Sequence, residues 1–182
     1  QQISEIIDYE TVLLLDVNKK PFQFSRIIYD DEYKLIDTDN VPYYIISNGK
    51  NIKFNDYFEK VQKIVREEVE VFDDLPNFDF DRYTFLACYA PNVNGDGMEH
   101  RNSTILTESQ DLNSNPLNHI ATAAHEFFHS WNVERIRPKS LEPFDFEEAN
   151  MSDALWFAEG FTNYYTNLIL CRTGLISEEN YL

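Results

Sequence analysis

Basic residues are scarce in this chain of 182 residues, and the shortage argues against the classes of protein that depend on them. Only 15 lysines and arginines stand against 32 aspartates and glutamates, which gives a formal net charge of −17. A surface of that sign repels the phosphates of nucleic acids and of anionic lipids. We therefore expect no nucleic acid and no membrane as a partner. The same charge favours cationic ligands, such as peptides with a free amino terminus.

Cysteines are few, and long apolar runs are absent. The chain has two cysteines, Cys88 and Cys171, and a pair so far apart is neither a disulfide framework nor a zinc knuckle. No run reaches the roughly 18–20 apolar residues of a transmembrane helix, and nothing in the sequence leads us to expect a signal peptide. Because the first residue is Gln1 rather than methionine, we expect a processed chain or a part of a longer protein, and the compartment stays undetermined.

Apolar residues make up 43% of the chain, which is enough for a packed core. Short β-type runs separated by turns predict a β-rich segment over 1–53, the end of an N-terminal β domain or its link. The spacing of the apolar residues then changes. Over 54–72 apolar positions recur every three or four residues, which predicts an amphipathic helix with Asn55 as its cap. Strands are predicted at 83–90 and 98–106.

Two further helices are predicted towards the C-terminus. The pair Asn115–Pro116 is a favourable helix start, and this helix is expected to extend to about Trp131. The acidic, proline-bearing stretch 137–150 indicates a loop. The last helix is expected to run from about Ser152 to a stop at Gly174. Strands first and helices afterwards indicate an α+β fold.

Two of only four histidines stand in one short stretch, AAHEFFHSWN at 123–132. On a helix, positions four apart lie on one face with β-carbons about 5–6 Å apart. His125 and His129 can therefore direct two imidazoles at one zinc ion. Glu126 would lie beside the metal rather than on it, where it can act as a general base. The alternative is a pair of histidines hydrogen-bonded in a core, with Glu126 a surface acid.

A catalytic zinc ion needs a third protein ligand, and two glutamates compete for that role. Glu148 follows His129 after 18 residues and Glu159 follows it after 29, so spacing alone favours Glu148. Glu148 lies in the charged stretch FDFEEAN, which needs no metal to explain it. Glu159 lies among large apolar residues in LWFAEGF, where an unpaired carboxylate would be costly. We therefore expect Glu159 to be the ligand.

The motifs GMEHRNST, HEFFHSWNVERIRP, FDFEEAN and LWFAEGFTNYY follow one another along the chain. They resemble the M61 glycyl aminopeptidase family of thermolysin-like gluzincin metallopeptidases, over about residues 72–174. The resemblance implies a twisted sheet over the HExxH helix, joined by a second helix that bears the third ligand. It implies one zinc ion per chain, held by His125, His129 and Glu159.

The resemblance also implies how a peptide is held and cleaved. Glu126 would take a proton from the zinc-bound water that attacks the peptide carbonyl. Glu99, in the glycine-led strand GMEHRNST, would bind the free amino group of the peptide. Gly97 would let the peptide backbone approach the strand closely. The alternative for Glu99 is an ordinary acid on an edge strand.

The expected function is a zinc-dependent aminopeptidase that hydrolyses the N-terminal peptide bond, with small first residues (Gly or Ala) implied by the family. The alternatives are a zinc endopeptidase on the same site and an inactive zinc-binding scaffold. Residues 54–182 would form the thermolysin-like catalytic subdomain. Family members continue with a helical domain and often a PDZ domain, so we expect the residue that stabilises the oxyanion to lie beyond Leu182.

Overall fold

The computed structural model describes residues 10–16, 23–25, 27–29, 35–36, 44–45, 54–79, 82–89, 94–110 and 114–181. The strands are β1 (Glu10–Asp16), β2 (Gln23–Ser25), β3 (Ile27–Tyr29), β4 (Leu35–Ile36), β5 (Tyr44–Ile45), β6 (Arg82–Tyr89), β7 (Asp96–His100) and β8 (Ser103–Glu108). The helices are α1 (Phe54–Phe72), α2 (Pro116–Phe128), α3 (Phe161–Arg172) and α4 (Glu178–Tyr181). Strands precede helices, as in the predicted α+β order.

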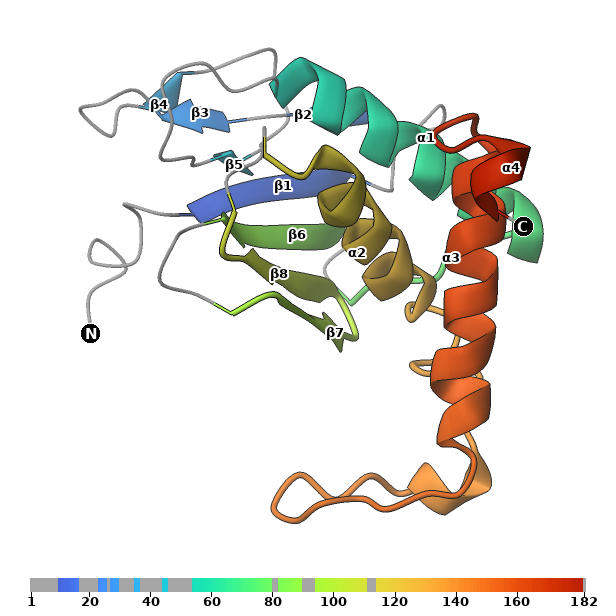
Figure 1. Ribbon diagram of the computed structural model, residues 1–182. Coiled ribbons are helices and arrows are strands. Elements are labelled where there is room, and N and C mark those ends of the chain that lie inside the picture. The colour runs from blue at the N-terminus through green and yellow to red at the C-terminus, as the bar shows by residue number, and fades with distance from the viewer. Residues whose placement is uncertain are drawn as a thin grey trace.

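The main sheet is mixed and has the strand order β2-β1-β6-β8-β7 (Figure 1). β6 and β8 run parallel, whereas β7 pairs antiparallel with β8. Within the described residues, β7 is the last strand at its end of this sheet, so one of its edges is free to pair with an extended peptide. A smaller sheet has the order β4-β3-β5.

Of the β-rich segment expected over 1–53, the structure describes five short stretches, and all are strands. β1 pairs with β6 along its whole length, and β2 pairs with β1. The rest of this segment lies outside the described residues, and the domain boundary at residue 53 stays a prediction.

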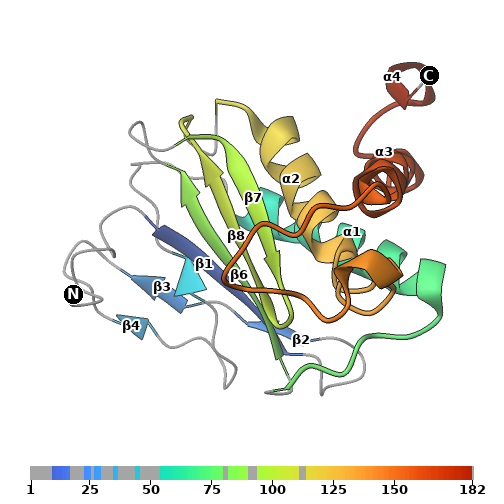
Figure 2. The same ribbon diagram turned by 90° about the horizontal axis from the view of Figure 1, so that it is seen from below.

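Helices α1 and α2 lie on the same face of the main sheet (Figure 2). β6 alternates in the way a half-buried strand requires, with Tyr83, Phe85 and its other odd-numbered positions buried. Phe127 of α2 packs on this face, with ring centroids 5.0 Å from Tyr83 and 5.5 Å from Phe85. Trp131, just after α2, stacks on Phe72 at the end of α1, at 4.6 Å. These aromatic contacts fix the position of the helix that carries the histidine pair.

The single strand predicted at 98–106 is wrong, because β7 and β8 form a hairpin there. Arg101 and Asn102 make the turn. Asp79, which precedes the hairpin in the sequence, stabilises this turn. Its backbone N–H donates to Asn102 Oδ1 at 2.9 Å, and its carboxylate accepts from Arg101 Nε at 2.9 Å. The turn therefore depends on a residue 22 positions earlier in the chain, which local sequence patterns do not reveal.

The predicted helices are present, and the second and third differ from the prediction at one end. α1 spans the predicted range, but Asn55 lies inside its first turn rather than at its cap. Asn115 is the cap of α2, and its side chain accepts from the backbone of Asn118. α2 ends at Phe128 rather than at about Trp131.

The last helix differs at its start. It begins with a π-helical turn at Trp156–Gly160 instead of near Ser152, and this turn leads directly into α3. Gly174, with a φ of +71°, provides the predicted stop. The loop over 137–150 is confirmed, apart from a 3₁₀ turn at Lys139–Leu141. None of the described helices is both long enough and apolar enough to cross a bilayer.

Candidate metal centre

Three candidate ligand atoms converge between α2 and the π-helical turn. The Nε2 atoms of His125 and His129 lie 3.1 Å apart, and Glu159 Oε2 lies 3.1 Å from the first and 3.7 Å from the second. Two ligands of a tetrahedral zinc ion, each at about 2.0–2.1 Å, are about 3.3–3.4 Å apart. The spacing of the three atoms and their chemistry, two imidazole nitrogens and one carboxylate oxygen, therefore suit a catalytic zinc ion with one open position.

The ring of His129 is held in the orientation that a metal ligand needs. Its Nδ1 lies 2.6 Å from the backbone carbonyl oxygen of Asn132, so Nδ1 carries the proton and donates it to that oxygen. Nε2 then keeps its lone pair and faces His125 and Glu159. A backbone carbonyl behind a histidine ligand is a common way to fix its tautomer. The ring is almost fully buried, which limits its freedom further.

Asn132 also positions the third ligand. Its side-chain Nδ2 donates to the carbonyl oxygens of Phe157 and Ala158, at 3.2 and 3.1 Å, and to Thr162 Oγ1 at 3.1 Å. These acceptors belong to the π-helical turn that carries Glu159 and to the first turn of α3. Asn132 thus joins the end of α2 to the segment that presents Glu159. Such wide turns often occur at functional sites.

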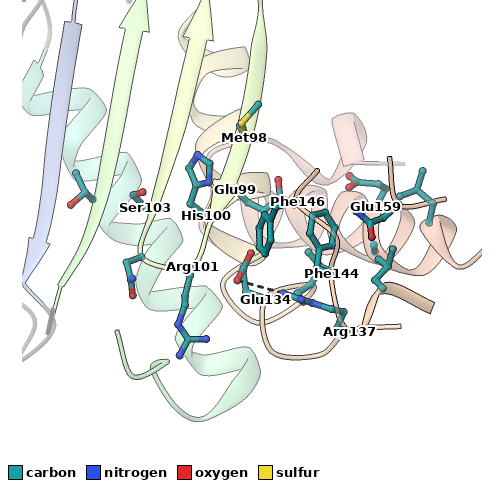
Figure 3. A pocket seen from close by; sticks show the side chains of 17 residues that line it. Met98, Glu99, His100, Arg101, Ser103, Glu134, Arg137, Phe144, Phe146 and Glu159 are labelled. Atoms are coloured by element: carbon teal, nitrogen blue, oxygen red, sulfur yellow. Dashed lines mark hydrogen bonds and ion pairs between the residues drawn. The ribbon is translucent and has the colours of Figure 1, made fainter. Parts of the chain in front are cut away.

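The carboxylate of Glu159 is well suited to a positive ion. The hydrogen bond from His125 Nε2 lowers the pKa of this carboxyl below its ordinary value. It is therefore the anionic member of the ligand set, and its side chain is 43% exposed towards the adjacent pocket (Figure 3). Glu148, the competing candidate, is exposed in the acidic loop and belongs to no group of potential metal ligands among the described residues.

Glu126 is buried next to the candidate ligands. Burial raises the pKa of this carboxyl to about 7, because the charged form is poorly solvated there. Its Oε2 has no hydrogen-bond partner. Glu126, Glu99 and His129 each place one potential ligand atom within 4.8 Å of the others. The alternative in which Glu126 is a surface acid is therefore wrong.

Gly97 on β7 gives Glu126 its space. A β-carbon at Gly97 would lie 2.1 Å from Glu126 Oε1 and 2.5 Å from its Cδ. The sequence suggested that this glycine allows a peptide backbone to approach, and the structure adds a second reason for glycine at this position. Residues two apart on a strand share a face, so Glu99 lies on the same side of β7 as Gly97.

Comparison with known proteins agrees with this arrangement. The family model described as M61 glycyl aminopeptidase matches residues 118–182, which include both histidines and Glu159. Over these residues the chain is similar to the M61 peptidase family. A search of curated proteins found no match. Among solved structures, an aminopeptidase N family protein from Idiomarina loihiensis is similar to this chain, with a TM-score of 0.64 and 30% identity.

That similarity covers 74% of the chain described here and 24% of the solved chain. The chain thus spans about a quarter of the length of this relative. Both comparisons thus relate this chain to proteins described as aminopeptidases.

The sequence analysis missed Asn132 as a residue that shapes the site. The only signal for Asn132 was its place in the motif HSWN, directly after a residue of the core. Its importance comes from contacts with residues 25 to 30 positions later in the chain.

Replacing Asn132 with alanine should weaken zinc binding. The change removes the side-chain amide that donates to the Glu159 segment, so we expect zinc affinity to fall by roughly 10- to 100-fold. Competition with a chromophoric chelator measures this affinity. Asn167→Ala is the matched control, because the Asn167 amide is exposed on α3 and donates to the Asn163 carbonyl. Equal affinities for the two variants would contradict this role of Asn132.

Proposed function

We propose that the chain is the metal-binding part of a zinc-dependent aminopeptidase with a thermolysin-like catalytic subdomain. The observation that carries the proposal is the convergence of His125, His129 and Glu159, with the buried Glu126 directly beside them. Bound zinc would lower the pKa of a water molecule to about 7 and polarise the carbonyl of a peptide. We propose one zinc ion per chain, held by these three residues.

Glu126 is proposed as the general base. It takes a proton from the attacking water and returns it to the leaving amine. A carboxyl with a pKa of about 7 suits both steps near neutral pH, because it can accept and donate a proton there. Gly97 keeps the space in which this carboxylate lies.

Glu99 is proposed to bind the free amino group of the peptide. It lies on β7, the strand with a free edge, close to both Glu126 and His129. A carboxylate there pairs with the ammonium group and places the first carbonyl of the peptide at the reacting centre. This arrangement makes the enzyme an exopeptidase. The family resemblance favours Gly or Ala as the first residue.

Two alternatives make different predictions. An endopeptidase on the same site would cleave peptides with a blocked amino terminus, which an enzyme that anchors the amine refuses. A zinc-binding scaffold would bind the metal without any turnover. The complete set of three ligands together with a buried base favours an enzyme.

Replacing Glu99 with glutamine should lower the turnover of peptides with a free amino terminus. The change keeps the shape and removes the charge that holds the ammonium group, so kcat/KM should fall by roughly 10- to 100-fold. The assay compares free and N-acetylated dipeptide arylamides with the intact, zinc-loaded protein. Equal rates on free and acetylated substrates in the wild type would instead support the endopeptidase.

Replacing Gly97 with alanine should impair catalysis and leave the metal in place. The new methyl group would force the Glu126 carboxylate away, and kcat/KM should fall by about 100-fold or more, as expected for loss of a general base. Zinc content, measured by elemental analysis, should stay at the wild-type level. Gly95→Ala is the control, because a β-carbon there meets Glu108 at 3.0 Å, away from the site. Full activity of the Gly97 variant would contradict the assignment of Glu126 as base.

A further inference from the structure

One acid in the core has no part in the proposed reaction. Glu68 lies on the stripe of α1 that packs into the core, one turn before Phe72. The other members of this stripe are Val61, Ile64 and Val65. The Glu68 side chain is completely buried, and neither of its carboxyl oxygens has a hydrogen-bond partner among the described residues. Buried polar groups of this kind are rare in folded proteins and need an explanation.

Two buried hydroxyls share the surroundings of this acid. Tyr83 on β6 and Ser130, directly after His129, are also fully buried, and within the described part of the chain their hydroxyl oxygens have no hydrogen-bond partner. The Ser130 hydroxyl lies close to that of Tyr83. Burial raises the pKa of the Tyr83 hydroxyl well above its ordinary value, and the nearby Glu126 and Glu68 carboxyls raise it further. Glu68, Tyr83 and Ser130 thus form one buried polar group.

This buried polar group adjoins the segment that presents a candidate zinc ligand. The HSWN segment, directly after α2, carries His129 and also Asn132, whose carbonyl oxygen accepts from the His129 ring. Trp131 of this segment stacks on Phe72 of α1 at 4.6 Å. Ser130 lies between the two residues that contact α1 and hold the metal. The buried polar group therefore connects α1 and β6 to the segment that places the His129 ring.

No cation balances a charge on Glu68. Burial raises the pKa of its carboxyl well above the ordinary value, and no charged group described on β6, α2 or α3 offsets this effect. The neighbouring Glu67 is paired with Arg172 of α3 at 2.7 Å. Arg135, which is close to Tyr83, donates to two backbone carbonyl oxygens instead. A buried carboxylate without a counter-ion is costly, so the uncharged acid is the favoured form.

We propose that Glu68 is a positioning residue for the candidate zinc site and that it acts in its uncharged form. A neutral carboxyl donates as well as accepts, so with the Tyr83 and Ser130 hydroxyls it can complete hydrogen bonds directly or through a buried water molecule. These bonds hold the HSWN segment, and with it the His129 ring, against α1 and β6. The inference rests on the proposed zinc site and goes beyond it, because none of the three residues is a candidate ligand.

The first test measures the zinc affinity of Glu68 variants of the intact protein by competition with a chromophoric chelator. Glu68→Gln keeps an uncharged side chain that forms hydrogen bonds, so it should bind zinc as wild type does. Glu68→Leu removes the hydrogen bonds and should weaken binding by roughly tenfold, the lower end of the effect of residues that support metal ligands. Glu70→Leu is the control, because Glu70 is exposed on the same helix.

A thermal unfolding curve of each variant separates positioning from stability. Leucine suits a core position, so Glu68→Leu should melt no lower than wild type and still bind zinc more weakly. Wild-type zinc affinity in Glu68→Leu would overturn the positioning role. Equal losses of affinity in Glu68→Gln and Glu68→Leu would show that the site needs a charged carboxylate, which also overturns the inference.

A second measurement determines the charge of Glu68 without zinc. The infrared difference spectrum of wild type minus Glu68→Gln at pH 7 should contain the carbonyl stretch of a protonated carboxyl. The ordinary pKa of this group is 4.5. Above that pH the unfolded chain releases the proton while the folded protein keeps it. The unfolding equilibrium constant of wild type, relative to Glu68→Gln, should therefore rise by about tenfold per pH unit above this value.

The outcomes distinguish this inference from the proposed function. A carboxylate band in the spectrum, or a stability difference that does not change with pH, overturns the uncharged Glu68 even if zinc binds. Absence of zinc from the wild-type protein overturns the proposed function and the positioning role with it, whereas a protonated Glu68 would still be observed.

Discussion

The hydrogen bonds of Asn132 are the contacts on which the candidate site depends. Its backbone carbonyl fixes the ring of His129, and its side chain holds the segment that presents Glu159. The candidate ligand His125 lies on α2 and His129 directly follows that helix, whereas Glu159 lies on a separate turn 30 residues further on. A metal site needs these parts positioned to within fractions of an ångström, and one buried residue connects both.

Each of the other candidate functional groups lies on an element that packs against the hydrophobic core. Aromatic packing of Phe127 on β6 fixes the helix of the histidine pair. The hairpin of β7 and β8 places Gly97 and Glu99 against that helix. The loop after α2 contributes Leu141, Phe144 and Phe146 to the lining of the pocket beside Glu159. The candidate ligands and the candidate base thus come from elements other than this loop.

Local patterns in the sequence predicted the features that depend on neighbours along the chain. The spacing of His125 and His129 needs only one helical turn, and the apolar surroundings of Glu159 distinguished it from Glu148. Features that depend on distant contacts were wrong or missing. The hairpin turn at Arg101 and Asn102 is held by Asp79, and the role of Asn132 depends on Phe157 and Ala158, each far away in sequence.

The central claim is that His125, His129 and Glu159 hold zinc, and the most direct test is the zinc content per chain after dialysis. Wild type and Glu148→Ala should each retain about one zinc ion, because Glu148 is an exposed acid of the loop. Glu159→Ala should lose the metal, because only two protein ligands remain. Retention of zinc by Glu159→Ala, or its loss from Glu148→Ala, would contradict the ligand set and the account built on it.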